Sequence, residues 1–348
     1  ASQIIVQESE TRKLDRHIFN EAYLMHTSTS PQYAIIASCD VSAAMMEPPG
    51  GTALVEESIM EALNFRRAMR KVDDEWGKDW WFKVWGPDKL APEGIGERDD
   101  WLLRANDNWH GFGDIAPGFT ILDPIKATVI TPGLDVSGRF AQTGIPASIV
   151  TKFLSEHGVI VEKTGLYSFF IMFTIGITKG RWNTLVTALQ QFKDDYDKNQ
   201  PLWRILPEFC AKHPRYERVG LRDLCQQIHE AYKANDVARV TTEMYLSDMQ
   251  PAMKPSDAFA CMAHRDIDRV EIDDLEGRIT SVLLTPYPPG IPLLIPGERF
   301  NRTIVEYLQF ARNFNAQFPG FDTDIHGLIE EEDAGGKTRY FIDCVRQR

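Results

Sequence analysis

The sequence predicts an α/β fold, and two observations carry this prediction. First, three apolar, β-branched segments have the composition of strands: KATVIT at 126–131, GVIVEKT at 158–164 and YSFFIMFTIGI at 167–177. Second, apolar residues recur at helical spacing over 145–157, between the first two strands, and again after Gly180. A strand, a helix, two paired strands and a helix can bury their apolar faces together as one α/β layer.

The segments before this layer are predicted to contain one strand and two helices. SQIIVQE at 2–8 reads as a strand, whereas YAIIASCDVSAAMM at 33–46 reads as an apolar helix. EPPGGT at 47–52 interrupts the chain, and a new helix is expected after it with Thr52 as its N-cap. The stripe predicted for the helix after Gly180 consists of Trp182, Leu185, Leu189, Phe192 and Tyr196.

The character of the chain changes again at 197–209, where DKNQPLWRILPEF reads as a domain boundary. Helices are predicted beyond it over 221–234 and 303–318. They flank a proline-rich segment at 284–300, and a hairpin is expected around EEEDAGGKT at 330–338.

Composition and charge narrow the functional classes. The chain has 348 residues, of which 43% are hydrophobic, enough for about two domains of ordinary size. Its net charge of −12 disfavours nucleic acid and anionic membranes as partners. The 5 cysteines are scattered without a CxxC pair, which argues for reduced thiols in the cytoplasm and against a zinc site. The apolar run at 166–177 is too short to cross a bilayer.

Glu162 is a charged residue in an unusual position, because it interrupts an apolar stretch that is predicted to be buried sheet. A buried carboxylate is costly unless a cation meets it, so Glu162 with Lys163 could form a pocket for a substrate ammonium group. The alternative is that the strand ends at this point and the carboxylate is half solvated. The residues themselves leave both interpretations open.

A hydroxyl-rich loop, MHTSTSP at 25–31, is a second candidate site. Its hydroxyl and backbone N–H groups could hold a phosphate, although an ordinary ST-turn and helix cap explain the same spacing. His110 in WHGFGD is expected to be a packed loop histidine, since no second metal ligand lies at a suitable spacing. The chain contains no Walker loop, GxGxxG, HExxH or GxSxG motif.

Several segments together resemble the bacterial ornithine/lysine/arginine decarboxylases, which are pyridoxal-phosphate enzymes of the aspartate-aminotransferase fold type. The similar segments run in family order along nearly the whole chain, and VEKTG with ITKGRW looks closest to lysine decarboxylases of the pseudomonad type. They are FNEAYLMHTSTSPQYAIIAS, WHGFGDI, LDPIKATVITPG, GIPASIV, HGVIVEKTG, FTIGITKGRWNTLV, GLRDLC, EGRI, PYPPGIPLLIPGE and FPGFDTDIHG.

The resemblance implies three parts within an α/β architecture. Residues 1–47 correspond to the end of an aminotransferase-type large domain that binds pyridoxal 5'-phosphate. Residues 48–198 correspond to a small α/β domain with a mainly antiparallel sheet, and residues 199–348 to an α+β C-terminal decarboxylase domain. The chain is thus similar to the carboxyl-terminal half of such an enzyme.

The resemblance also assigns roles to the two candidate sites. Ser28, Thr29 and Ser30 match a loop that approaches the cofactor phosphate, and Glu162 matches the acceptor for the distal ammonium of the substrate. Arginine-specific members lack an acid at that position. The lysine that forms the Schiff base lies in a Ser-x-His-Lys motif, which is absent from this sequence and is expected upstream of Ala1, so no catalytic residue is assigned in this chain.

The function implied is decarboxylation of a basic amino acid, L-lysine to cadaverine and carbon dioxide, in acid stress or polyamine metabolism. Arginine and ornithine remain alternative substrates, and family likeness implies homodimers assembled into a decameric ring. A second hypothesis is a catalytically dead fragment that serves as an interaction or regulatory subunit. An aminotransferase is a weaker alternative, because no obvious arginine for the α-carboxylate stands out in the small domain.

Overall fold

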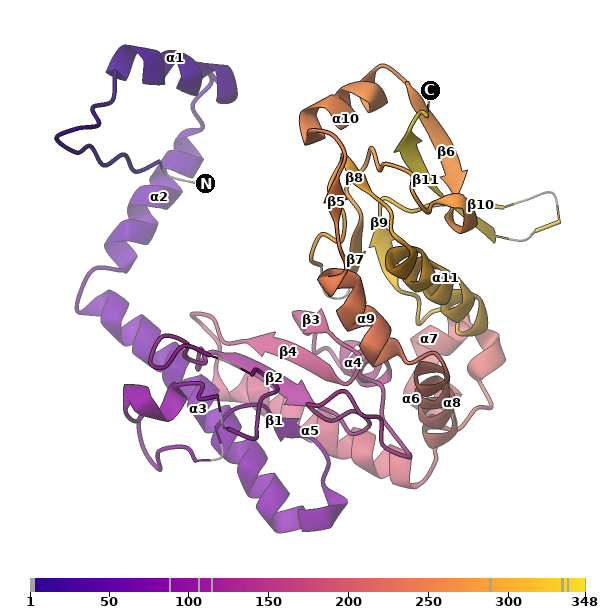
Figure 1. Ribbon diagram of the computed structural model, residues 1–348. Helices are drawn as coiled ribbons and strands as arrows, with labels where there is room; N and C mark the ends of the chain where they lie inside the picture. The colour runs from indigo at the N-terminus through magenta and orange to yellow at the C-terminus, as the bar shows by residue number, and fades with distance from the viewer. Residues whose placement is uncertain are drawn as a thin grey trace. The chain divides into compact units, whose positions relative to one another are not determined.

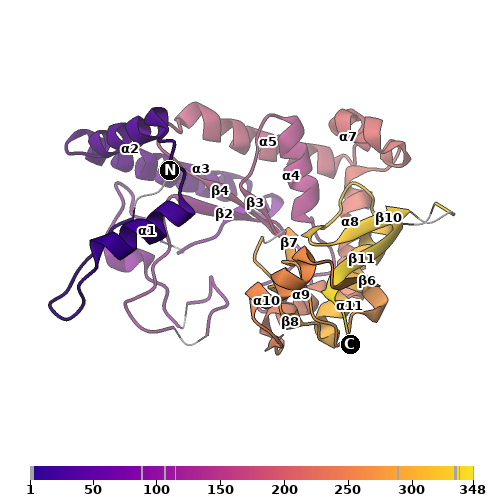
Figure 2. The same cartoon turned by 90° about the horizontal axis from the view of Figure 1, so that it is seen from above.

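The computed structural model describes residues 4–87, 89–105, 107–113, 115–287, 290–332, 335–336 and 338–347. The chain divides into two compact units, Ala1–Ile59 and Met60–Arg348. Figures 1 and 2 show the ribbon from two directions. Within the described residues, no helix has both the length and the apolar content needed to span a membrane.

The first unit consists of helices. They are α1 (Arg16–His26), α2 (Tyr33–Met45) and the beginning of α3 (Gly50–Trp76). Asp15 caps α1 by accepting hydrogen bonds from the backbone N–H groups of His17 and Ile18. The apolar helix predicted at 33–46 is confirmed as α2, but α3 begins at Gly50 rather than after Thr52.

The strand predicted at 2–8 is wrong for its described part, since residues 4–8 form no strand. A strand needs a neighbour to satisfy its backbone groups, and the described part of this unit offers none. Neither α1 nor α2 contains a buried residue, so the apolar surface of α2 is open to solvent.

The N-terminal part of the second unit contains a four-stranded antiparallel sheet with the strand order β1-β2-β4-β3. The strands are β1 (Lys83–Val84), β2 (Lys126–Ile130), β3 (Lys163–Thr164) and β4 (Ser168–Met172). The strands predicted at 126–131 and 167–177 are confirmed, with shorter bounds. The strand predicted at 158–164 is reduced to two residues at the sheet edge, because the backbone bends at Glu162.

Helices α3, α4 (Ala147–Glu156) and α5 (Lys179–Asp197) lie along one face of this sheet (Figures 1 and 2). The predicted stripe of α5 points into the core, where Trp182, Leu185, Leu189 and Phe192 are buried. Aromatic side chains pack between the helices and the sheet. The ring centroid of Phe65 in α3 lies 5.5 Å from that of Phe173, which directly follows β4.

The same core continues beyond the predicted boundary at 197–209. Helices α6 (Leu202–Ile205), α7 (Pro207–Lys212) and α8 (Leu221–Ala234) contribute buried side chains to it, and Val237 is its last buried residue before Phe314. The division between residues 198 and 199, like that between 47 and 48, therefore stays a prediction.

A second core forms the C-terminal part, which mixes helices and antiparallel strands as an α+β arrangement. Strands β10, β11 and β6 form one sheet, and its β10–β11 pair confirms the hairpin predicted at 330–338; residues 333, 334 and 337 lie outside the described range. The helices are α9 (Val237–Leu246), α10 (Pro255–Ala263) and α11 (Arg302–Gln317). The strands are β5 (Gln250–Pro251), β6 (Ile267–Glu271), β7 (Thr285–Tyr287), β8 (Glu298–Arg299), β9 (Asp324–His326), β10 (Ile329–Glu332) and β11 (Thr338–Val345).

A buried tyrosine–histidine pair joins the sheet to α8. The Tyr167 hydroxyl lies 2.6 Å from His229 Nδ1, and His229 Nε2 lies 3.0 Å from the Ala141 carbonyl oxygen. Because a carbonyl only accepts, Nε2 carries a proton. Burial lowers the pKa of His229, so the imidazole is neutral near pH 7 and Nδ1 accepts from the Tyr167 hydroxyl. The loop around the pair is close-fitting: a Cβ on Gly144 would lie 2.2 Å from His229 Nδ1.

This geometry predicts an acid-sensitive contribution to stability. Burial lowers the pKa of His229 below its ordinary 6.5, so the unfolded chain takes up the proton first as pH falls. The contribution is fully present above about pH 6.5 and is lost as pH falls toward the lower folded-state pKa. Thermal unfolding followed by circular dichroism should therefore show a falling Tm between pH 7 and pH 5.

The variant His229→Gln tests the assignment. It should cost about 1–3 kcal/mol at pH 7.5, since it disturbs two buried hydrogen bonds, and it should flatten the fall in Tm. The exposed His264 provides the control, because His264→Gln should leave the pH profile unchanged. An unaltered pH dependence in His229→Gln would show that other groups cause it.

Candidate functional site

Glu162 lies at the bend that precedes β3, where its backbone N–H donates to the Phe170 carbonyl oxygen at 2.9 Å. Its side chain is exposed, so the interpretation of a carboxylate buried in the sheet is wrong. The physical reason is the shortness of β3, which leaves Glu162 beyond the paired edge. The alternative is confirmed for the acid, which is solvated, but wrong for the strand, because β3 begins after Glu162 and does not end there.

Glu162 nevertheless lines a cavity of about 540 Å³ between the β3–β4 edge and the start of α5. The walls are mostly apolar, and Trp182, whose indole N–H donates to Glu61 Oε2 at 2.5 Å, is held in a fixed orientation. The charged side chains on the wall are Glu162 and Arg181. The rest of the lining is Gly158, Val159, Ile160, Ile171, Met172, Phe173, Thr174, Ile177, Thr184 and Leu185.

Arg181 was missed by the sequence analysis. It occupies the first turn of α5, and its exposed side chain makes no hydrogen bond or ion pair with any described residue. The sequence did contain a sign of it: Arg181 stands in the first turn of a predicted helix, where a cation interacts unfavourably with the helix dipole. A residue that breaks a local electrostatic rule without compensation is a candidate for function.

The hydroxyl loop lies in the first unit, whereas Glu162 lies in the second. Ser28, Thr29 and Ser30 are all exposed, and Ser28 Oγ accepts a hydrogen bond from the Ser30 backbone N–H at 3.1 Å. This bond is the ST-turn that the spacing suggested as the ordinary interpretation. The hydroxyl hydrogen of Ser28 is not used in that bond, so the loop still presents three hydroxyl donors to solvent.

His110 is a packed loop histidine, as expected. It is only 4% exposed, and its ring lies 4.8 Å from that of Trp109 and 5.5 Å from that of Phe112. Its Nδ1 atom accepts from the Phe112 backbone N–H at 3.3 Å.

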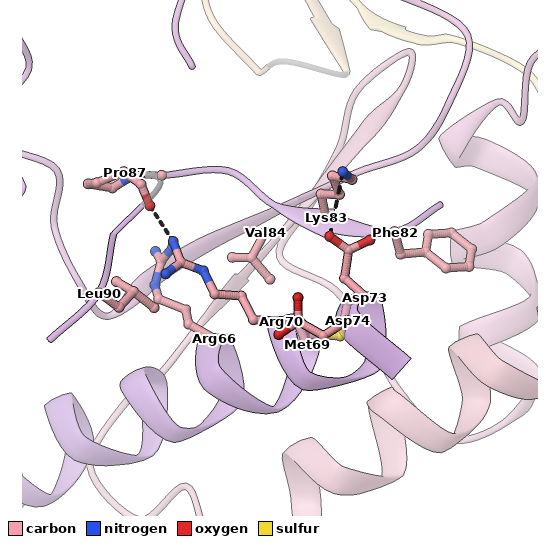
Figure 3. Close-up of a pocket in the computed structure, with 11 residues that line it drawn as sticks. Arg66, Met69, Arg70, Asp73, Asp74, Phe82, Lys83, Val84, Pro87 and Leu90 are labelled. Carbon is pink, nitrogen blue, oxygen red and sulfur yellow. Dashed lines mark hydrogen bonds and ion pairs between the residues drawn. The ribbon is translucent and has the colours of Figure 1, made fainter. Parts of the chain in front are cut away.

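A smaller cavity, of about 280 Å³, lies between α3 and β1 (Figure 3). Its basic side chains are already engaged: Arg70 donates to the Pro87 carbonyl, and Lys83 lies 3.5 Å from Asp73. Arg66 is 3% exposed and donates to the carbonyls of Pro124, Trp85 and Lys126. Burial, helped by the neighbouring Arg70, lowers the pKa of Arg66 to about 10. These groups therefore hold the fold and do not favour this cavity as an anion site.

The Arg66 network predicts a large effect of a conservative substitution. In Arg66→Lys a single ammonium replaces the planar fork and cannot reach three separate carbonyls, so buried acceptors lose their partners. We expect the free energy of unfolding to fall by about 2–4 kcal/mol in urea titrations. The exposed Lys71→Arg should change it by less than about 0.5 kcal/mol; equal effects at both positions would contradict the assignment.

The chain matches two family descriptions in order along its length. These are "Orn/Lys/Arg decarboxylase, major domain" over residues 1–181 and "Orn/Lys/Arg decarboxylase, C-terminal domain" over residues 238–346. Lysine decarboxylase LdcA of Pseudomonas aeruginosa is 50% identical over 352 residues, which cover 100% of this chain and 47% of that protein. The constitutive lysine decarboxylase of Escherichia coli is 36% identical over 329 residues, covering 93% of this chain and 45% of that protein.

The solved structures agree with the sequence comparisons. Lysine decarboxylase A from Pseudomonas aeruginosa superposes with a TM-score of 0.91 at 50% identity, over 96% of this chain and 45% of that one. The chain thus spans about half the length of the curated relatives it matches. The resemblance inferred from the sequence, including its pseudomonad character, is confirmed, and this chain belongs to the Orn/Lys/Arg decarboxylase family.

Proposed function

We propose that this chain is part of a pyridoxal-phosphate-dependent decarboxylase that converts L-lysine to cadaverine and carbon dioxide. The observation that carries the proposal is the 50% identity, over the whole chain, to a protein named as a lysine decarboxylase. The chemistry of the cavity supports it, because its walls are mostly apolar and the Glu162 carboxylate on them pairs with no described residue.

Glu162 would act by binding the ammonium group at the far end of the substrate. In the chain by itself the carboxylate is hydrated, and an exposed ion pair contributes only about 0.2–1 kcal/mol. The contribution grows when bound substrate excludes water from the cavity. A shorter diamino acid leaves the carboxylate without its partner, which favours lysine over ornithine; arginine remains the alternative substrate.

The residues available for the cofactor are Ser28, Thr29 and Ser30. Three exposed hydroxyl groups fit the acceptor oxygens of a phosphate, although the loop itself carries no cation to balance the charge. When bound, pyridoxal phosphate supplies the sink for the electrons released as the carboxylate leaves. The chain contains no Ser-x-His-Lys motif, so the amine that anchors the cofactor has to come from another part of the enzyme.

The assembly is proposed to be a homo-oligomer. Ile35, Ile36 and Val41 of α2 are each at least half exposed, and neither α1 nor α2 buries a residue within the described chain. Apolar surface on this scale needs cover from another polypeptide surface. The five free cysteines fit a reducing compartment, and we place the enzyme in the cytoplasm. A regulatory subunit without activity is the second candidate, since the same exposed helices would serve it.

Two predictions test this proposal, and the first concerns Glu162 in a polypeptide that joins this chain to the family's lysine-bearing segment. Glu162→Gln keeps the shape but removes the charge, so kcat/KM for lysine should fall about fivefold or more while cofactor content stays constant. Steady-state kinetics with lysine, ornithine and arginine measure the change in kcat/KM for each substrate. Equal lysine turnover in the variant and the parent enzyme would remove the ammonium-binding role.

The second prediction concerns Ser28 in the same polypeptide. Ser28→Ala removes one hydroxyl donor, so the cofactor should be lost faster during dialysis, with retention followed by absorbance. Ser38→Ala is the matched control, because the Ser38 hydroxyl donates to the Ile35 carbonyl within α2. If Ser28→Ala retains the cofactor as well as the control does, the phosphate assignment fails.

A further inference from the structure

We propose that the cavity beside β3 binds the whole amino acid as a zwitterion, with Glu162 receiving the side-chain ammonium and Arg181 the α-carboxylate. The Glu162 half rests on the proposed function, and the Arg181 half is new. Arg181 would thereby select an intact amino acid over its decarboxylated product.

The cavity carries one charge of each sign. Among the residues that line it, Glu162 and Arg181 are the charged ones, and they come from two different elements, the bend before β3 and the first turn of α5. Neither side chain has a hydrogen bond or ion pair within the described chain. Two opposite charges without partners among the described residues, in one cavity with mostly apolar walls, complement a ligand with charged ends and an aliphatic body.

The position of Arg181 in its helix also favours an anionic ligand. The first turn of α5 contains no acidic residue, and Lys179 adds a second cation to it. Both cations oppose the helix dipole, which favours negative charge at this end. A ligand carboxylate placed here would meet the arginine and the positive end of the helix together, and guanidinium geometry suits a carboxylate.

The residues next to Glu162 and Arg181 are held in place by hydrogen bonds. Trp182 follows Arg181, is 6% exposed, and is tied to Glu61 of α3 by its indole N–H. On the other side, the backbone of Glu162 is hydrogen-bonded to Phe170 in β4. The two charged side chains therefore project from fixed backbone positions, which lowers the entropic cost of binding.

The test measures binding to this 348-residue chain without cofactor, by ligand-observed NMR titration. The probes are L-lysine, ε-aminocaproate, which keeps the carboxylate and the terminal ammonium, and cadaverine, which has no carboxylate. Lysine and ε-aminocaproate should bind alike, and cadaverine at least about tenfold more weakly. Arg181→Gln should weaken lysine to the level of cadaverine, and Glu162→Gln should weaken all three.

Lys179→Gln is the matched control, because it removes the same charge from the same helical turn without lining the cavity. It should leave binding nearly unchanged. Thermal unfolding adds a second readout: Arg181→Gln should have an equal or higher Tm, since it relieves the unfavourable dipole interaction. A lower Tm with unchanged binding would give Arg181 a structural role and overturn the proposal.

The outcomes separate the two halves. If cadaverine binds as tightly as lysine and only Glu162→Gln weakens both, Arg181 has no role, whereas the proposed function stands. If Arg181→Gln weakens lysine and Glu162→Gln does not, the ammonium role fails and the two-charge site with it. Absence of binding by all three probes overturns the zwitterion site, while the kinetic test of Glu162 decides the proposed function independently.

Discussion

The packing of α5 against the four-stranded sheet is the constraint on which the candidate site depends. Buried aromatic side chains hold α5 in this position: the ring centroid of Phe192 lies 5.9 Å from that of Phe82, which directly precedes β1, and 5.3 Å from that of Phe153 in the neighbouring helix α4. Burial of each such ring contributes on the order of 2–3 kcal/mol, far more than any surface ion pair nearby. This core fixes where α5 begins relative to the β3 edge, and therefore which side chains share the cavity.

The exposure of Glu162 changes the kind of selectivity that the site can have. A fully buried acid would penalise every ligand lacking a cation by several kcal/mol, because it would stand unpaired in a dry interior. A solvated acid gives up its water only when the ligand arrives, so its discrimination depends on how completely the ligand closes the cavity. A second charge, of opposite sign and in the same cavity, would supply the selectivity that an exposed carboxylate lacks by itself.

The two proposed binding functions belong to different units of the chain. The hydroxyl loop at Ser28–Ser30 follows a helix that buries none of its residues, whereas Glu162 and Arg181 rest on a well-packed core. The proposed substrate recognition can therefore be tested on this chain directly, because the cavity walls belong to the same core. Cofactor binding needs the cover that α1 and α2 lack within the described chain.

The sequence by itself determined the amphipathic helices, two of the four sheet strands, the order of the segments and the family. These follow from local periodicity, as in the α5 stripe from Trp182 to Phe192, or from motifs such as VEKTG. Only the tertiary structure decided that Glu162 is exposed and that Arg181 shares its cavity. Burial and proximity depend on where a strand stops pairing and on how distant elements pack, and a one-dimensional pattern of apolar residues encodes neither.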